Sequence, residues 1–488
     1  MVRNRFKHFF TAFFILFYVT SSNEVIGQSD LWNVPEGFLV EEAVSNLFLP
    51  VNIAFVPNPQ SDLDTPIYYI TELYGQVKVV LRSGDVRVYA DSLLNFTPTG
   101  DFPGSGEMGV TGIVVEPNTG DLFVTMVYDD GGIKNKVVRM SSNDGGRSVA
   151  TITTLLDDIP GPPQSHQIHA ATIGLDGKLY IQVGDGTEAE SAQRDDDLRG
   201  KVLRMNLDGS IPEDNPNATS YVYAKGFRNP FGGAWREADG FLYVSDNGPE
   251  WDDRLVKVEP GGNMGWPNSL LPGAIKLWNP TVAPTAVKFY EGAGFPEPFQ
   301  GRLFVALSGP TYLLGQTERG KRIDMFTLAE DGSVTSEEIF LNYVGNGRAT
   351  VVGLAFGPDG LYFTDLYGED GFDSNGLTHS NVYRVSYHPI KVARNSESSA
   401  LTQFTLAQNY PNPFNPTTAI EFSIPESGFI TLRIFNILGK EITTLIAERL
   451  TKGINKVMWN AHGLPSGVYL YQLQVADFVK TKKLMLIR

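Results

Sequence analysis

Apolar and polar residues follow one repeated pattern along most of the chain. A short apolar segment is followed by a turn containing Pro, Asp or Gly, and then by a second apolar segment with an aromatic residue at its centre. Short apolar segments bounded by such turns are typical of β-strands. Six copies can be recognised: 53–55 with 67–69, 113–115 with 122–124, 171–173 with 179–181, 233–235 with 242–244, 287–289 with 303–305, and 354–356 with 361–363.

The spacing of the copies indicates how they are arranged. Their central aromatic residues recur every 55 to 63 residues, which leaves room for four strands and their loops in each copy. No long amphipathic helical pattern lies between them. A row of β-sandwiches would use the same strands, but a closed ring of sheets hides more strand edges. We therefore predict an all-β chain with a six-bladed β-propeller over residues 28–388.

The pattern changes near the C-terminus. Residues 389–403 are polar, rich in Ser and without periodicity, which predicts a linker. A proline-rich opening at 409–418 then precedes alternating segments at 430–434, 456–459 and 468–473. We predict that residues 404–488 form a small immunoglobulin-like β-sandwich. The pattern alone would suit an adhesion or carbohydrate-binding module.

The N-terminus has the features of a secretory signal peptide. Arg3, Arg5 and Lys7 precede an apolar run over 9–19, and small residues follow it. A run of 11 residues is short of the roughly 20 that are needed to span a bilayer. We therefore expect residues 1–27 to be cleaved and the mature chain to contain no transmembrane segment.

Composition and charge narrow the function classes. The chain has no cysteine, which excludes disulfides, thiolate metal sites and a catalytic thiol. The formal net charge is −16, but residues 28–403 alone carry −22, whereas the region from 404 onward carries nine Lys and Arg against five Asp and Glu. So acidic a body repels phosphate backbones and anionic lipids and attracts calcium. We expect no nucleic acid partner.

Two residues suggest acid–base chemistry at the propeller axis. His166 precedes the first strand of the third copy and Asp185 follows the second, so a hairpin would place both at the same end. An imidazole oriented by a carboxylate is a suitable general base near neutral pH. The alternatives are a loop histidine beside an ordinary turn aspartate, and a metal pair formed by His166 with His169.

The segment Arg199-Gly-Lys-Val-Leu-Arg-Met-Asn-Leu-Asp-Gly-Ser-Ile-Pro-Glu-Asp-Asn-Pro216 resembles the signature of the glucose/sorbosone dehydrogenases. Further matches follow in the same order at 226–230, 248–253, 261–267 and 280–284, and the resemblance covers about residues 38–388. It implies a six-bladed propeller that uses pyrroloquinoline quinone with calcium to oxidise aldose sugars at the anomeric carbon.

The resemblance assigns roles to individual residues. His166 matches the catalytic base and Asp185 the carboxylate that orients it. Arg228 and Asn229 match the pair that hydrogen-bonds the quinone carbonyl, where a cation stabilises developing negative charge.

The remaining assignments concern the metal and the cofactor. Gly248 and Pro249 match positions whose backbone oxygens bind calcium, an ion that prefers hard oxygen ligands. Asp253 and Thr281 match cofactor contacts, and Glu107 matches a polar residue of the pocket.

The chain also departs from the family pattern. Quinone-binding members carry a pair of arginines before the last copy of the repeat, where this chain has Thr350 and Val352, with only Arg348 nearby as a predicted cofactor contact. Other departures are Phe227, Phe231, Asn279 and Glu318. A tricarboxylate cofactor needs cations, so these changes would weaken its binding.

The C-terminal region has a resemblance of its own. The motifs at 409–418, 435–441, 464–469 and 482–484 are similar to those of type IX secretion sorting domains. This implies that the domain is recognised by the type IX machinery, and that the protein is secreted and then either released or attached at the cell surface.

Together these observations predict a secreted quinone-dependent sugar dehydrogenase with a small-molecule sugar substrate. Two alternatives remain open. One is a non-catalytic cell-surface propeller that binds a glycan or a protein, and the other is a calcium-dependent lactonase-like hydrolase.

Overall fold

A computed structural model describes residues 29–98, 107–162, 165–249, 251–310, 313–388, 404–461, 464–475 and 478–487. The predicted signal peptide, 1–27, and the predicted linker, 389–403, lie outside the described residues. No helix of the described residues is long and apolar enough to cross a membrane.

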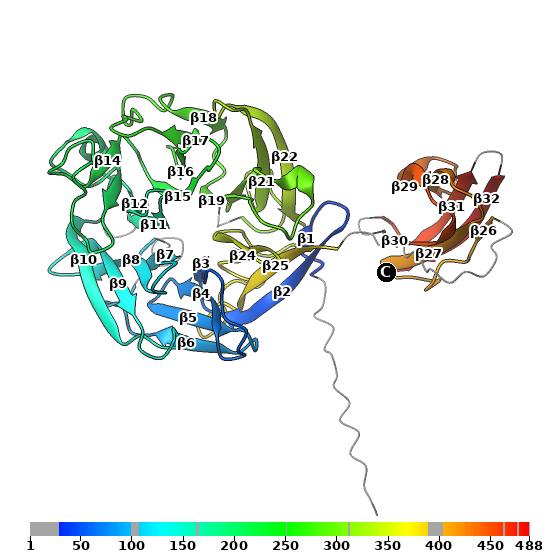
Figure 1. Cartoon of the computed structure of the whole chain (residues 1–488), viewed down its shortest axis with the longest axis horizontal. Coiled ribbons are helices and arrows are strands. Elements are labelled where there is room, and N and C mark those ends of the chain that lie inside the picture. The colour runs from blue at the N-terminus through cyan, green and yellow to red at the C-terminus, as the bar shows by residue number, and fades with distance from the viewer. Residues whose placement is uncertain are drawn as a thin grey trace, which may run out of the picture.

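Between residues 29 and 388 the described strands form six antiparallel sheets around a common axis (Figure 1). The first sheet contains β3 (Pro50–Phe55), β4 (Pro66–Glu72), β5 (Gln76–Leu81) and β6 (Val86–Ala90). The second contains β7 (Val110–Val115), β8 (Leu122–Asp129), β9 (Ile133–Ser141) and β10 (Thr151–Pro160). The third contains β11 (Ile168–Ile173), β12 (Leu179–Val183), β13 (Lys201–Met205) and β14 (Val222–Lys225).

The second half of the ring has the same plan. The fourth sheet contains β15 (Pro230–Trp235), β16 (Leu242–Asp246), β17 (Asp253–Val258) and β18 (Ala274–Trp278). The fifth contains β19 (Pro284–Phe289), β20 (Leu303–Leu307), β21 (Arg322–Leu328), β22 (Val334–Tyr343) and the short β1 (Trp32–Asn33). The sixth contains β23 (Leu354–Gly357), β24 (Gly360–Thr364), β25 (Ser380–Tyr387) and β2 (Phe38–Leu47). Two short 3-10 helices, η1 (Ala189–Gln193) and η2 (Glu297–Phe299), lie in loops.

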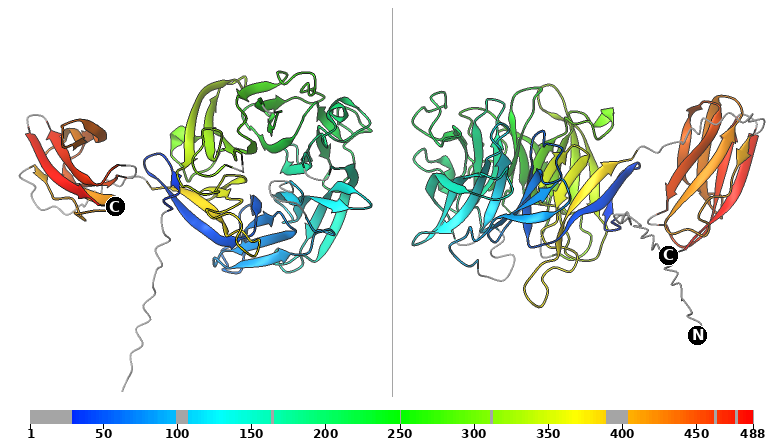
Figure 2. Two further views of the ribbon diagram at one scale, coloured as in Figure 1. Left: turned by 180° about the vertical axis from the view of Figure 1, so that it is seen from behind. Right: turned by 60° about the horizontal axis from the view of Figure 1, so that its bottom comes forward.

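The ring is closed by strands from both ends of this region. The inner strands β3, β7, β11, β15, β19 and β23 contact one another in turn, and β23 contacts β3 again. In the sixth sheet, β2 from the start of the region pairs with β25 from its end. Figure 2 shows the same ring from behind and in a view tilted by 60° about the horizontal axis. The all-β propeller expected from the sequence is confirmed.

The repeated pattern corresponds to the two inner strands of each sheet. Each of its six pairs falls within β3 and β4 or the equivalent strands of the other sheets. The central aromatic residues are all buried and pack between neighbouring sheets. Tyr68 of the first sheet lies 5.5 Å from Tyr362 of the sixth, and Tyr180 of the third lies 4.8 Å from Trp235 of the fourth, measured between ring centroids. The pattern therefore marks the interfaces between sheets.

Five of the inner strands carry a register shift near their start. At each shift, the inner strand has one residue more than its partner strand between the two flanking pairs. Such β-bulges bend a strand and redirect a side chain. The residues at the shifts are Val51, Thr111 with Gly112, His169 with Ala170, Phe231, and Thr285.

The C-terminal region forms a β-sandwich of two sheets. One contains β26 (Thr405–Leu406), β27 (Thr417–Ile424) and β30 (Gly453–Asn460). The other contains β29 (Glu441–Leu450), β28 (Gly428–Asn436), β31 (Gly467–Val475) and β32 (Phe478–Leu486). Alternate residues of both sheets, including Ile430, Leu432, Ile434 and Trp459, form its core. The predicted sandwich is confirmed.

Candidate active site

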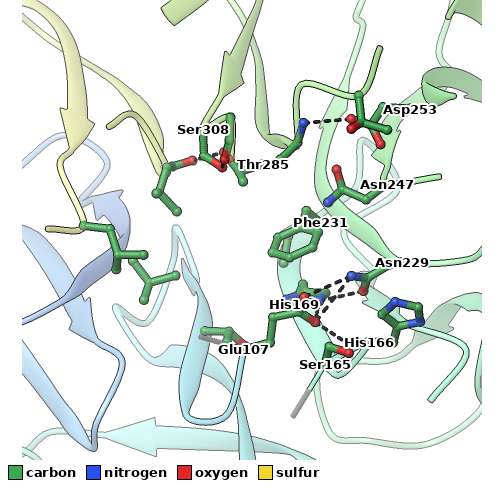
Figure 3. A pocket seen from close by; sticks show the side chains of 18 of the residues that line it. Glu107, Ser165, His166, His169, Asn229, Phe231, Asn247, Asp253, Thr285 and Ser308 are labelled. Carbon is green, nitrogen blue, oxygen red and sulfur yellow. Dashed lines mark hydrogen bonds and ion pairs between the residues drawn. The ribbon is translucent and has the colours of Figure 1, made fainter. Parts of the chain in front are cut away.

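A cavity of about 550 Å³ lies on the propeller axis, where the inner strands begin. Residues from all six sheets and their loops line it, and every register shift described above contributes a side chain: Val51, Thr111, His169, Phe231 and Thr285. Polar groups far apart in the sequence therefore meet in one place (Figure 3).

His166 and Asp185 form a hydrogen-bonded pair at this cavity. His166 Nδ1 lies 2.5 Å from Asp185 Oδ1, and since a carboxylate can only accept, Nδ1 carries the hydrogen. Asp185 is 1% exposed and lies behind the histidine, whereas His166 itself lines the cavity. This leaves His166 Nε2 as the nitrogen that can accept a proton from a bound molecule.

Two further donors hold the Asp185 carboxylate. Thr187 N donates to Oδ1 at 2.8 Å, and Trp266 Nε1 donates to Oδ2 at 2.8 Å. The indole ring of Trp266 also lies 5.7 Å below the Arg228 guanidinium. Trp266 therefore links the carboxylate of the pair to the nearby cation.

A second histidine occupies a separate network. His169 Nε2 lies 3.0 Å from Asn229 Oδ1 and 3.4 Å from Glu107 Oε2, both of which are acceptors. Asn229 Nδ2 donates to Glu107 at 3.2 Å, and the backbone N–H of His166 donates to the same carboxylate. Burial raises the pKa of Glu107, but the hydrogen bonds and charges of the two histidines outweigh it and the pKa is lowered.

His166 and His169, considered above as an alternative metal pair, have separate hydrogen-bond partners. The described residues contain no cluster of three or more His, Asp or Glu side chains suited to hold a metal ion. The register shift separates the directions of the two histidines, which the spacing in the sequence does not reveal.

The loop that leads into the fourth sheet supplies Arg228 and Asn229. The Arg228 guanidinium is half-buried, lines the cavity and donates from Nη1 to Asn247 O at 3.1 Å. Asn229 N donates to Asp246 Oδ1 at 2.8 Å, and Asp246 Oδ2 is paired with Arg254 Nη2 at 2.7 Å in a fully buried ion pair. Asp185 N donates to Arg228 O at 2.7 Å, so the backbone ties the third sheet to the fourth.

The loop from 247 to 253 borders the same cavity. Gly248, Pro249 and Asp253 all line it. A Cβ at Gly248 would lie 1.7 Å from Asp252 O, so the close approach requires glycine. Asp253 accepts from Gly248 N at 2.9 Å and from Val282 N at 2.7 Å, and it therefore braces the loop. Burial raises the pKa of Asp253 to about 6.

Oxygen atoms gather at this loop. Asn247 Oδ1 is buried and has no hydrogen-bond partner among the described residues. It adjoins the backbone of Gly248 and Pro249, and amide and carbonyl oxygens are ligands that calcium prefers. The donor set therefore fits a hard cation.

Thr281 also lines the cavity, and its hydroxyl accepts from Arg319 Nη2 at 2.8 Å. Arg348 is not among the described residues that line it, and its role as a cofactor contact stays a prediction. Its backbone N donates to Glu369 O, and its Cδ packs against Gly371. Both contacts keep it beside the 368–371 loop.

The described lining residues of the wall formed by the fifth and sixth sheets carry no charge at the cavity surface. Thr350 is buried with its hydroxyl donating to Ser308 O, and Val352 lines the cavity with Leu366 and Tyr367. Among the described lining residues, Arg228 is the sole cation, and Glu107 and Asp253 are the anions. The cavity thus fits the reactive carbonyls of a quinone and a calcium ion, and it does not provide a clamp for three carboxylates.

The other departures noted in the sequence have different places. Phe227 is fully buried, and Phe231 lines the cavity. Asn279 and Glu318 are exposed.

Two sequence profiles match this chain. Residues 408–487 match the profile described as a secretion system C-terminal sorting domain. Residues 50–365 match the profile described as Glucose / Sorbosone dehydrogenase.

Curated relatives agree with the second match. Quinoprotein glucose dehydrogenase B of Acinetobacter calcoaceticus is 30% identical over 264 residues, covering 48% of this chain and 53% of the relative. Aldose sugar dehydrogenase YliI of Escherichia coli K12 is 24% identical over 344 residues, covering 63% and 87%. The chain thus spans about half the length of the first relative and most of the second.

Solved structures share the fold. A structure described as an oxidoreductase (glucose dehydrogenase) from Thermus thermophilus has a TM-score of 0.58 at 26% identity, covering 72% of this chain and all of that one. The PQQ-bound form of the aldose sugar dehydrogenase from Streptomyces coelicolor has a TM-score of 0.55 at 22% identity, with the same coverage. The chain belongs to the glucose/sorbosone dehydrogenase family.

Proposed function

We propose that this protein is a secreted, quinone-dependent dehydrogenase that oxidises an aldose at its anomeric carbon. The observation that carries the proposal is the His166–Asp185 pair at the axial cavity, beside Arg228 and Asn229. The names of the curated relatives, a glucose dehydrogenase and an aldose sugar dehydrogenase, support the substrate class.

The histidine pair supplies the base. His166 Nε2 accepts the proton of the anomeric hydroxyl, while Nδ1–H stays bonded to Asp185. The buried carboxylate stabilises the imidazolium that results and keeps the ring in one orientation. The donors Thr187 N and Trp266 Nε1 keep that carboxylate in place.

Arg228 and Asn229 are the residues that would hold the reactive carbonyls of pyrroloquinoline quinone, which when bound supplies the acceptor for the hydride leaving the sugar. The Arg228 guanidinium stabilises negative charge in this part of the cavity. Glu107 and His169 orient the Asn229 amide by hydrogen bonds to its two ends. Gly248, Pro249 and Asn247 would hold calcium.

The C-terminal sandwich supports the place of action. Its match to a secretion sorting domain supports export by the type IX machinery, followed by release or attachment at the cell surface. The signal peptide expected at 1–27 would direct the first step of this route.

One observation favours a second candidate function. The uncharged wall of the fifth and sixth sheets suits a surface propeller that binds a glycan or a protein without a cofactor. Quinone binding separates the two functions.

The experiment is a calorimetric titration of the purified protein with pyrroloquinoline quinone in calcium, followed by aldose-dependent dye reduction. We expect saturable binding that a calcium chelator weakens, and turnover with at least one neutral aldose. His166→Ala should lower turnover by roughly 10²- to 10⁴-fold, the usual contribution of a general base.

The control is His379→Ala, which removes an exposed histidine paired with Asp373. It should leave turnover unchanged. Full activity in His166→Ala would exclude His166 as the base, and absence of quinone binding by the folded protein would favour the binding propeller.

A further inference from the structure

The cavity contains an aromatic surface that the proposed chemistry does not use. Phe231 is the extra residue at the register shift of β15, and its ring stacks on the His169 imidazole with centroids 3.7 Å apart and planes at 19°. Figure 3 shows Phe231 projecting into the cavity above His169. One face of the phenyl ring is thus covered, and Phe231 still lines the cavity.

The stack is held rigidly. His169 is 3% exposed, and its Nε2 is fixed by Asn229 Oδ1 and Glu107 Oε2. The bulge prevents Phe231 from joining the regular ladder, since Pro230 pairs with Asp246 and Gly232 with Ser245. A rigid aromatic ring loses little conformational freedom when a second ring stacks on it.

The surroundings leave space for a flat molecule. The residues of the other inner strands at the same level are small or branched: Val51, Thr111, Thr285 and Gly353. A volume of about 550 Å³ lies within the range of small-molecule and cofactor sites, roughly 300–1,000 Å³.

The described wall of the fifth and sixth sheets offers no cation to an anionic group. The charged side chains among the described lining residues are Arg228, Glu107 and Asp253. Behind the opposite wall, Asp365 is fully buried and its Oδ2 has no partner among the described residues. Lys321 is turned away, because its Nζ donates to Gly347 O at 3.0 Å and lies over the Tyr343 ring. Among the described residues that line this wall, a carboxylate would meet no cation, and the nearby Arg319 guanidinium is held by Thr281 Oγ1 at 2.8 Å.

We propose that the cavity holds the ring system of its quinone by stacking on Phe231, and that it accepts an uncharged planar ortho-quinone at least as well as the tricarboxylate. The proposal rests on the proposed function, because it concerns the cofactor of the same site. It identifies the ligand class as a flat conjugated quinone whose carboxylates contribute little to affinity.

The test compares pyrroloquinoline quinone with its trimethyl ester, which has the same rings and no carboxylate charge. Both are titrated into the purified protein in calcium, and binding is measured by calorimetry and by quenching of protein fluorescence. We expect the ester to bind with equal or higher affinity. A tricarboxylate that binds more than tenfold more tightly than the ester would overturn the charge argument.

Variants at Phe231 test whether its ring is the platform on which the quinone stacks. Phe231→Leu keeps an apolar side chain and removes the aromatic face, so it should weaken both quinones by roughly three- to tenfold, the usual value of an aromatic stack. Phe231→Tyr should restore binding. The matched control is Phe289→Leu, a half-buried aromatic residue of β19 that does not line the cavity. Unchanged affinity in Phe231→Leu would overturn the platform.

The outcomes separate this proposal from the proposed function. If both quinones bind and no aldose reduces the dye, the platform stands and the dehydrogenase function fails. If the tricarboxylate binds and supports turnover while the ester does not bind, the function stands and the platform proposal fails. Binding of neither quinone by the folded protein overturns both.

Discussion

The fourth and sixth sheets each contain a buried aspartate near the cavity, and the two carboxylates have different partners. In each, an aspartate at the end of the second strand accepts from the backbone N–H at the start of the first. Asn229 N donates to Asp246 Oδ1 at 2.8 Å, and Thr350 N donates to Asp365 Oδ1 at 2.9 Å. The backbone geometry is equivalent, and the difference lies in the second carboxylate oxygen.

Among the described residues, that oxygen is hydrogen-bonded to a cation in one sheet only. Asp246 Oδ2 accepts from Arg254 Nε and Nη2 at 2.9 and 2.7 Å, and both side chains are fully buried. Asp365 Oδ2 has no partner among the described residues, and burial raises the pKa of Asp365 to about 7. The propeller thus keeps an ion-paired carboxylate beneath the wall with Arg228 and Asn229. Beneath the neutral wall it keeps a carboxylate that is near Lys321 but has no cation hydrogen-bonded to it among the described residues.

The largest effect is expected from removing the counter-charge. Arg254→Met leaves Asp246 buried without a cation and should lower the free energy of unfolding by about 3–5 kcal/mol. Urea denaturation followed by fluorescence measures it. Lys276→Met, which breaks an ion pair with Glu337 closer to the surface, should cost at most about 1 kcal/mol. Equal losses in the two variants would show that Arg254 has no special role.

The second prediction concerns pH. The pKa of Asp365 is raised on folding, so the folded state binds the proton more tightly and stability falls as the pH rises from about 4 to about 7. Within this window each pH unit costs about 1.4 kcal/mol for a proton held only by the folded state. Asp365→Asn keeps an oxygen for the backbone donors and removes the titration. Its stability should fall less over this range and exceed that of the wild type at pH 8.

The pH dependence is read from urea midpoints at pH 5, 6, 7 and 8. Asp253, whose pKa is raised to about 6, contributes in the same direction in both proteins. Parallel curves for the wild type and Asp365→Asn would contradict the assignment.

The third prediction concerns a substitution that adds a cation to the neutral wall of the fifth and sixth sheets. Val352 is 8% exposed and lines the cavity, so Val352→Arg places a guanidinium among the sixth-sheet residues. One charge-assisted hydrogen bond should raise the affinity for the tricarboxylate quinone by about tenfold. The affinity for the trimethyl ester should not rise. Calorimetry with both ligands measures the effect, and an equal rise for both would mean that charge is not the cause.

The smallest effect is expected at Trp266. Trp266→Phe keeps a ring beneath Arg228 but removes the donor to Asp185 Oδ2. The Asp185 carboxylate then orients the imidazole less firmly, so kcat/KM should fall by roughly fivefold, about the value of one hydrogen bond. An unchanged kcat/KM would mean that the Trp266 donor does not position the pair.

The sequence predicts those parts of the site that depend on local order. The inner strand pairs follow from the spacing of apolar segments. The meeting of His166 and Asp185 follows from their positions at the ends of one hairpin, and the resemblance added Arg228 and Gly248. Each of these lies within one sheet or one continuous motif.

The remainder depends on contacts between sheets. His169 and Phe231 reach the cavity because register shifts turn them inward, and a single sequence carries no clear signal for a bulge. Trp266 bonds to Asp185 across 81 residues. The place of Arg348 depends on packing against Gly371, which the sequence does not reveal.

The pairing of β2 with β25 has a consequence for how the molecule is made. Arg384 Nη2 bonds to Glu41 Oε2 across 343 positions of the chain, so the ring closes only after the last strand has been synthesised. Contacts of such long range slow folding and expose unpaired strand edges until they form. The axial cavity exists only in the closed ring, and a chain that stops before β25 would be expected to lose the whole cavity rather than one wall of it.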